Sequence, residues 1–198
     1  AHIPAIRLLL QGRAEPNARC LCLERGCEFP LQLAASCTNF VRSSDRLQAV
    51  ELLLKAGAWP SPRRGDAEAN TPLHDAARRG DLDLAKLLLR HAADPNVVNG
   101  FGEAPLQLAL RPGGDFLPDA TSYAMVEALL QAGASPLVFG DDGLPPEVYA
   151  LSPEMRELLA KSAAWWRCRM LAWIRSRGRD QHFGQLLPEL LVQVAKFL

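Results

Sequence analysis

The sequence predicts an all-α solenoid built from short helix–turn–helix repeats, and three recurring features favour this fold class. Pro-Leu pairs open apolar stretches at Pro30, Pro72 and Pro105, with a degenerate copy at Pro146. Leucine-rich runs follow these pairs, centred near residues 53, 88, 129 and 158. The first three runs are closed by Gly-Ala or Ala-Ala pairs at 57–58, 92–93 and 133–134. Self-similarity of this kind indicates units that bury their apolar faces by stacking on one another.

The first element is half a repeat. Residues 4–10 read as the second helix of a unit, and the chain starts with Ala rather than Met. We therefore expect a fragment of a longer protein, so missing targeting signals carry no weight.

The repeats around the middle one contain insertions. Pro72 and Pro105 are 33 residues apart, whereas Pro30 to Pro72 spans 42 and Pro105 to Pro146 spans 41. From each proline to the centre of its leucine run is 16 residues in the middle repeat, but 23 and 24 in its neighbours. The excess falls between the two helices, at 36–46 and 111–121, where the composition is that of loops. Insertions at one structural point map to one face of a solenoid, which is often functional.

The middle repeat carries the strongest local signals. Thr71 can cap the first helix, and Pro72 fits its first turn, where a missing N–H costs nothing. Gly80 suits the turn after that helix, where a left-handed residue is favoured. The second helix has a broad apolar face, made by Leu82, Leu84, Ala85, Leu87, Leu88 and Leu89.

The stretch from Thr71-Pro72-Leu73-His74 to Asp94-Pro95-Asn96 resembles a near-consensus ankyrin repeat, and the resemblance covers about residues 3–160. It implies an ankyrin-repeat domain over 1–160 that recognises another protein. It also implies that His74 is structural, through hydrogen bonds of its ring and the Thr71 hydroxyl within the turn. Phe29 and Ala104 replace the threonine, and Gln32 and Gln107 replace the histidine, so we expect the flanking repeats to be individually weaker.

Composition and motifs argue against an enzyme. The 198 residues include 22 basic and 22 acidic ones, and this balance removes any global argument for nucleic acid or a membrane surface as partner. The longest apolar run, 186–198, contains Pro188, Glu189, Gln193 and Lys196, so we expect no membrane span. No phosphate loop, nucleophile elbow or helix-borne His-Glu pair occurs in the sequence, so we predict no catalytic residue and no cofactor.

The cysteines indicate a reducing compartment, cytoplasm or nucleus. Their number is odd and their spacing uneven, unlike a disulfide framework; they are Cys20, Cys22, Cys27, Cys37 and Cys168. The first four could in principle bind zinc, but their spacing matches no usual ligand pair. We interpret them as ordinary thiols and predict no metal site.

A partner-binding surface is predicted from position in the stack. In ankyrin repeats the finger tips and the exposed side of each first helix line the concave groove. The residues at those places are Trp59, Glu68, Asn70, Asp75, Arg78, Arg79, Phe101, Glu103 and Arg111. Trp59 stands where the family usually has Asp, and an exposed Trp is a strong interface anchor. The alternative is that Trp59 packs on the inserted loop at Phe40.

The segment 161–198 follows the last recognisable repeat. Residues 164–175 read as one helix with an apolar face, and 187–198 as a second, amphipathic helix that starts at its Pro188. The segment resembles a SOCS box, and also the opening of an F-box; the residues concerned are Cys168, Leu171, Leu187, Pro188, Leu190 and Leu191. Either resemblance implies recruitment of a cullin ubiquitin ligase through an adaptor, with the repeats selecting the substrate.

Two other interpretations of this segment remain. It can be a helical cap over the apolar face of the last repeat, which every solenoid needs. Its arginines and tryptophans can also form a nucleic-acid patch, which would require Trp165 and Trp173 to be exposed. The alternative to such a patch is a solvated basic face, which is favoured because the tryptophans follow the apolar stripe that we expect to be buried.

Overall fold

The computed structural model describes residues 3–22, 26–36, 43–63, 68–110, 119–137, 150 and 152–177. Within these ranges it places the side chains except those of 20–22, 26–28, 43, 119–121 and 170–177.

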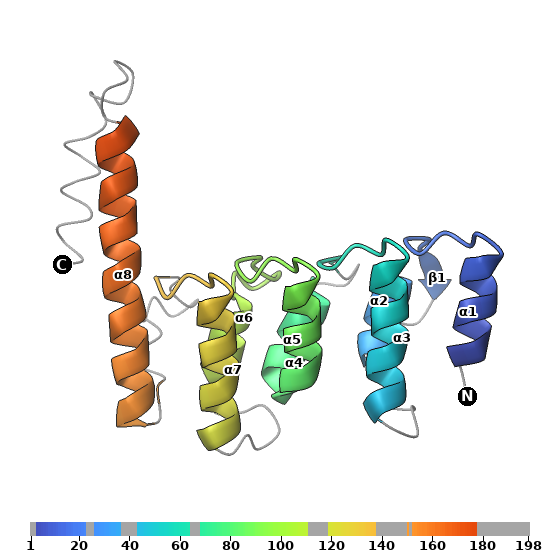
Figure 1. Ribbon diagram of the computed structural model, residues 1–198, viewed down its shortest axis with the longest axis horizontal. Coiled ribbons are helices and arrows are strands. Elements are labelled where there is room, and N and C mark those ends of the chain that lie inside the picture. The colour runs from blue at the N-terminus through green and yellow to red at the C-terminus, as the bar shows by residue number, and fades with distance from the viewer. Residues whose placement is uncertain are drawn as a thin grey trace.

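The helices stack in two layers, which confirms the all-α ankyrin-type solenoid (Figure 1). The inner layer holds α2 (Pro30–Ser36), α4 (Pro72–Arg79) and α6 (Pro105–Leu110). The outer layer holds α1 (Ile3–Gln11), α3 (Ser43–Lys55), α5 (Leu82–Arg90), α7 (Asp119–Gln131) and α8 (Pro153–Arg177). Each inner helix packs against the outer helix that follows it, and neighbours within each layer also touch. One continuous hydrophobic core therefore runs through the stack.

The middle repeat folds as its sequence predicts. Gly80 ends α4 in the left-handed conformation, at φ 67°, and Asp81 then caps α5 by accepting a hydrogen bond from the Leu84 N–H at 3.1 Å. Asp81 also forms a salt bridge with Arg46 of α3. Leu84, Ala85 and Leu88 are buried, because they share the face of α5 that meets α4 and the neighbouring repeats.

Two connections between paired helices are longer than the Gly80-Asp81 turn. Helix α2 ends at 36 and α3 begins at 43, while α6 ends at 110 and α7 begins at 119. The connecting residues 37–42 and 111–118, which belong to the predicted insertions, lie outside the described residues.

A short hairpin adds to the helical architecture. Strands β1 (Cys20–Cys22) and β2 (Gly26–Glu28) pair antiparallel, with Cys20 opposite Glu28 and Cys22 opposite Gly26. The cysteine-rich stretch therefore includes two short strands between α1 and α2. Among the residues with placed side chains, no group of three or more potential metal ligands occurs.

Helix α8 is one continuous element that runs past the predicted boundary at 160/161. Its first half closes the stack, because Met155, Leu159 and Ala163 are buried. Trp165, Cys168 and Arg169 are exposed, and the helix projects beyond the repeats (Figure 1). Within the part of the chain that is described, no helix has both the length and the apolar character to cross a membrane.

Candidate interaction surface

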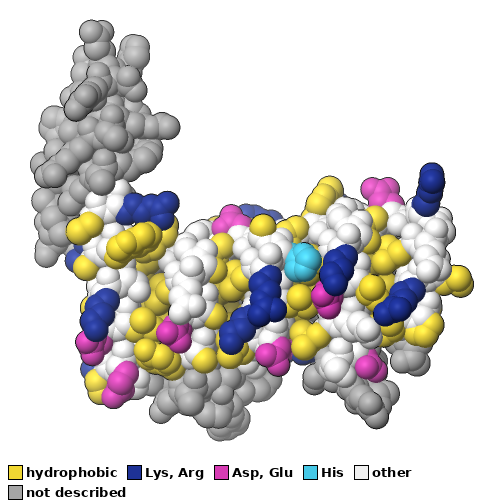
Figure 2. Space-filling model, in the orientation of Figure 1, with side chains coloured by type: hydrophobic (Ala, Val, Ile, Leu, Met, Phe, Trp, Pro, Cys, Tyr) yellow, Lys and Arg dark blue, Asp and Glu magenta, His cyan; other side chains and the backbone are white. Residues whose placement is uncertain are grey.

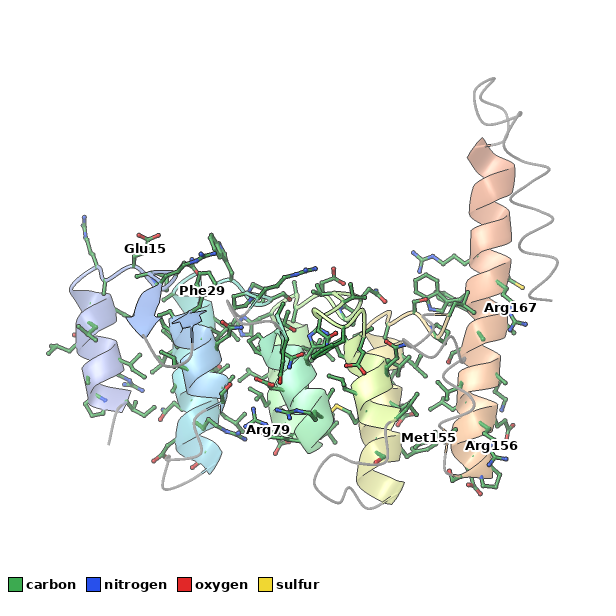
Figure 3. All side chains as sticks on the ribbon, turned by 180° about the vertical axis from the view of Figure 1, so that it is seen from behind. Glu15, Phe29, Arg79, Met155, Arg156 and Arg167 are labelled. Carbon is green, nitrogen blue, oxygen red and sulfur yellow. The ribbon has the colours of Figure 1, made fainter. Side chains whose placement is uncertain are left out.

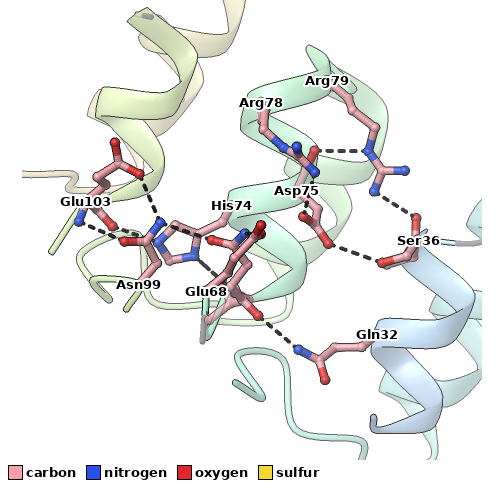
Figure 4. Close-up of polar contacts among 12 residues, drawn as sticks. Gln32, Ser36, Glu68, His74, Asp75, Arg78, Arg79, Asn99 and Glu103 are labelled. Atoms are coloured by element: carbon pink, nitrogen blue, oxygen red, sulfur yellow. Dashed lines mark hydrogen bonds and ion pairs between the residues drawn. The ribbon is translucent and has the colours of Figure 1, made fainter. Parts of the chain in front are cut away.

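The loops that lead from an outer helix to the next inner helix are called fingers below. Each finger is held by a side chain near the start of the inner helix that follows it. His74 Nδ1 accepts a hydrogen bond from the Thr71 N–H at 3.2 Å, and lies 2.7 Å from the Thr71 hydroxyl. Since Nδ1 is an acceptor, the ring proton sits on Nε2, which donates to the Glu103 carbonyl of the next repeat at 3.0 Å (Figure 4). Burial lowers the pKa of His74, so the ring is neutral near pH 7. The imidazole is a structural link between repeats.

Glutamine stands in this place in the flanking repeats, and Gln32 makes the same kind of link to the next repeat. Gln32 Oε1 accepts from the Phe29 N–H at 3.4 Å, while its Nε2 donates to the Asn70 carbonyl of the next repeat at 3.0 Å. Gln107 Oε1 accepts from the Ala104 N–H at 2.6 Å. An amide has one acceptor and a donor group, which is what the neutral imidazole supplies, so the replacements preserve the geometry.

The turns after the outer helices are also joined from repeat to repeat. Asn17 donates to the Gly57 carbonyl at 3.1 Å and accepts from the Trp59 N–H at 2.8 Å. Asn96 repeats the pattern with the Gly133 carbonyl at 3.0 Å and the Ser135 N–H at 2.7 Å. These two asparagines act as clamps between successive turns.

Trp59 is the most prominent side chain of the predicted surface. It is 57% exposed, and its ring leans on Phe29 with the ring centroids 5.6 Å apart and a tilt of 58°. Arg19 lies over the Phe29 ring at 5.1 Å. The backbone of Trp59 is fixed by Asn17, so the ring is anchored on one side and open on the other. The alternative contact, Phe40, lies outside the described residues.

A second exposed aromatic side chain lies on the next finger. Phe101 is 58% exposed, and its N–H donates to Asn99 Oδ1 at 3.0 Å. The same Asn99 oxygen accepts from the Glu103 N–H at 2.9 Å, which closes the finger loop. Glu68, on the preceding finger, is exposed as predicted. Its carboxylate accepts from Asn70 Nδ2 at 2.7 Å.

Three predicted contact residues are buried instead of exposed. Asn70, Asp75 and Glu103 have exposed fractions of 4%, 2% and 5%. Asn99 Nδ2 donates both to Asn70 Oδ1 and to Glu103 Oε2 at 3.1 Å, so those two side chains join neighbouring fingers. Asp75 accepts from the Ser36 hydroxyl at 3.1 Å, across the gap between α4 and α2 (Figure 4). The expectation of exposure was wrong for them because they bind neighbouring repeats.

The two arginines of α4 differ from one another. Arg78 is exposed, with its guanidinium 3.6 Å from Asp75. Arg79 is half-buried and donates to the carbonyls of Asp75 at 3.1 Å and Ala35 at 3.4 Å. Arg79 thus ties α4 to the end of α2 (Figures 3 and 4). Arg79 therefore has a structural role, whereas about half of the Arg78 side chain is exposed. Arg111 lies outside the described residues.

The predicted adaptor residues are only partly described. Cys168 is exposed on α8, and Leu171 lies on the same helix with its side chain outside the description. Leu187, Pro188, Leu190 and Leu191 lie outside the described residues.

The tryptophans of α8 bear on the nucleic-acid interpretation. Trp165 is exposed, while the side chain of Trp173 is not described. Arg169 lies 5.2 Å from the centroid of the Trp165 ring and 5.8 Å from that of Trp166. In the described part of this helix, Arg169 thus contacts the rings of Trp165 and Trp166, the side chains that a nucleic-acid patch would use for stacking on bases.

Sequence reasoning missed the residues that support Trp59. Asn17, Arg19 and Phe29 hold or flank it, and none was predicted to belong to the surface. For Asn17 a signal exists, because Glu15-Pro16-Asn17 repeats the place of Asp94-Pro95-Asn96 after a leucine run.

Known proteins share this pattern of repeats. The family model "Ankyrin repeats (many copies)" matches residues 53–109. Mouse "Ankyrin repeat and SOCS box protein 16" is 42% identical over 146 residues, which cover 69% of this chain and 30% of that protein. The human protein of that name is 39% identical over 127 residues, covering 64% of this chain and 24% of the relative. Mouse "Cyclin-dependent kinase 4 inhibitor B" is 35% identical over 112 residues, covering 57% of this chain and 76% of the inhibitor. The chain thus spans about a quarter to a third of the length of the first two relatives.

Proposed function

This chain belongs to the ankyrin-repeat family, whose repeats are protein-interaction scaffolds, and we propose that it binds a protein partner through its fingers with Trp59 as the main anchor. The observation that carries the proposal is the half-exposed Trp59 ring on a fixed backbone. Interface energy concentrates in Trp, Tyr and Arg side chains that lose little freedom on binding. Trp59 meets both conditions.

Phe101 and Arg78 extend the proposed surface along the stack. Phe101 offers a second exposed ring on the next finger, and Arg78 offers an exposed guanidinium on α4. Arg111 and the insertions stay part of the proposal on their sequence position alone. In contrast, Asn70, Asp75 and Glu103 act on the shape of the fingers, so their replacement would change binding only indirectly.

The proposal is tested by photo-crosslinking from single positions. A benzoyl-phenylalanine placed at 59 in the full chain, expressed in cells, should yield a discrete adduct with another protein. The same group at Gln131, an exposed position on α7, should not yield that adduct. The Trp59→Ala variant should recover the crosslinked protein at least about tenfold less well, with little change in thermal unfolding because most of the ring faces water. Undiminished recovery by Trp59→Ala would contradict the role of this residue.

We further propose that the chain has no catalytic activity of its own and acts in the cytoplasm or nucleus. Support comes from the match to a family of binding repeats and from the odd, uneven cysteine set. Turnover of a substrate by the purified chain would contradict the first part.

A second candidate function is that of a substrate receptor for a cullin-type ubiquitin ligase. It is favoured by the similarity to two proteins named "Ankyrin repeat and SOCS box protein 16" and by the projecting second half of α8 with its exposed Cys168. In this proposal the fingers hold the substrate while the segment 164–198 holds the adaptor.

The test separates the two ends of the molecule. The full chain should co-purify with an elongin-type or Skp-type adaptor, and deletion of 164–198 should abolish this. Trp59→Ala should leave adaptor binding unchanged. Failure of the full chain to retain either adaptor would reject the receptor function and leave the finger proposal intact.

A further inference from the structure

A groove separates two outer helices on the face shown in Figure 2. Its volume is about 590 Å³ and it lies between α3 and α5. It is lined by Ser44, Asp45, Leu47, Gln48, Glu51, Asp83, Lys86, Leu87 and Arg90. Since these helices form the outer layer, the groove is separate from the inner helices and from Trp59.

The groove has an apolar floor and opposite charges at its two ends. Leu47 and Leu87 are partly buried and pack against the hydrophobic core. Asp45 and Asp83 lie in the first turns of α3 and α5, whereas Arg90 lies in the last turn of α5. Lys86 precedes Arg90 by four residues, on the same side of α5. One end is therefore acidic. The other end holds Glu51 as well as Lys86 and Arg90, but Glu51 is paired with Lys55, so the unpaired charge at that end is basic.

The basic side chains have no counterpart within the described molecule. Neither Lys86 nor Arg90 forms a salt bridge with any described residue, although Glu51 across the groove is paired with Lys55 at 2.7 Å. Like charges four residues apart slightly destabilise a helix. The helix dipole accounts for Arg90 near the C-terminus of α5, but gives little to Lys86 in its middle. Their charge is free to attract an external group.

We propose that this groove binds a helix of a protein partner, antiparallel to α3 and α5, with acidic residues in its first turns and basic residues in its last. The outer helices run in the same direction, so an antiparallel helix brings its start to Lys86 and Arg90 and its end to the aspartates (Figure 1). This charge order is the one that a helix favours through its own dipole. An apolar stripe on the ligand covers Leu47 and Leu87, as in other complexes of a helix in a groove.

This surface goes beyond the finger proposal and does not depend on it. A helix in the groove leaves Trp59 and Phe101 uncovered, so the chain can hold two proteins at once. Such bivalence is a useful property of a scaffold, because it raises the effective concentration of one ligand near the other.

The test uses a labelled helical peptide of about four turns. Its first two turns carry glutamates, its last two carry lysines, and a leucine stripe runs along one side. A twin peptide has the same leucine stripe and glutamine at every charged position. In fluorescence anisotropy at low salt, the full chain should bind the first peptide at least about tenfold more tightly than the twin, and salt should reduce the difference. The K86E/R90E double variant should abolish the preference, because both ends of its groove are acidic.

Matched variants show whether the peptide lies in this groove. Lys161→Glu changes an exposed lysine on α8 and should leave the preference unchanged, as should Trp59→Ala. Thermal unfolding followed by circular dichroism confirms that each variant is folded. Equal affinity for the two peptides, or a preference that K86E/R90E leaves as it was, would overturn the proposal. Loss of peptide binding in Trp59→Ala would overturn it too, while supporting the fingers as the binding site.

Discussion

Single side chains near the start of the inner helices form hydrogen bonds to the following repeat. His74 and Gln32 each hold the backbone at the start of their own inner helix and reach a carbonyl of the following finger. The family motif predicted the histidine, and the glutamines were expected to weaken their repeats. The hydrogen bonds show why glutamine fits the same place, since it offers an acceptor and a donor at about the same reach; the expected weakness of these repeats stays a prediction.

Exchanging His74 for glutamine should make the domain less sensitive to acid. Burial holds the pKa of His74 below its usual value in the folded chain, so the unfolded chain takes up a proton first as the pH falls. The stabilising effect is complete above the unfolded pKa, near 6.5, and is lost between that value and the lower folded pKa. Over that window the unfolding free energy of the wild type should fall faster than that of His74→Gln, by up to about 1.4 kcal/mol per pH unit. Urea titrations at pH 7.5 and 5.5 (about two units apart) measure this; parallel curves would contradict it.

The buried face of a helix was easier to predict than the burial of side chains in the fingers. The periodicity of α5 correctly predicted the buried Leu84 and Leu88. Position alone also suggested that Asn70 and Glu103 are exposed, but both are buried because Asn99 of the third finger binds them. The contact with Asn70 joins two neighbouring fingers, and the contact with Glu103 lies within one finger loop, so a helical period contains no information about either.

At the scale of elements, side-chain hydrogen bonds join each turn after an outer helix to the next such turn. Asn17 and Asn96 each bind a carbonyl and an N–H of the next turn, and the Ser61 hydroxyl accepts from the Asp94 N–H at 3.0 Å between them. Stability in a solenoid is a sum of repeats and of interfaces between neighbours. These hydrogen bonds belong to the interfaces.

Asn96→Ala should therefore weaken one interface without disturbing a core. The variant loses hydrogen bonds to Gly133 and Ser135. We expect a loss of about 1 kcal/mol, because water replaces part of each bond at this exposed site. Amide hydrogen exchange should increase mainly in α7 and α8. Gln131→Ala, an exposed change on α7, is the control and should have no measurable effect. A uniform increase of exchange along the whole chain would contradict a local interface.

The elements themselves could be predicted to different degrees. The Pro-Leu starts and leucine runs placed α2 to α7 correctly, because each repeat combines a cap, a turn and an apolar face. The strand pair β1 and β2 was missed, since three residues per strand are too few for an alternating pattern. The continuity of α8 was missed as well. Its repeat pattern fades near Lys161, yet Ser162-Ala163-Ala164 contains no helix-breaking residue.

The whole molecule combines a closed stack with a helix that extends beyond it. Met155, Leu159 and Ala163 of α8 cover the last repeat, as a terminal cap must. Trp165, Cys168 and Arg169 follow these buried residues along α8 and are exposed. The buried residues of α8 thus lie in its first half, which caps the repeats, and the exposed Trp165, Cys168 and Arg169 follow them in its second half.

Truncation separates these two halves of α8. A chain ended after Ala163 keeps every described residue of α8 that is buried, so its thermal unfolding midpoint should stay within a few degrees of the full chain. A chain ended after Ser152 lacks the buried side chains Met155, Leu159 and Ala163 and should lose at least about 3 kcal/mol, as for the removal of large core side chains. Circular dichroism melts of the full chain and both truncations make the comparison. If ending the chain after Ala163 destabilises the stack as much as ending it after Ser152, then the segment 164–198 is part of the cap, and the proposed adaptor function loses its free helix.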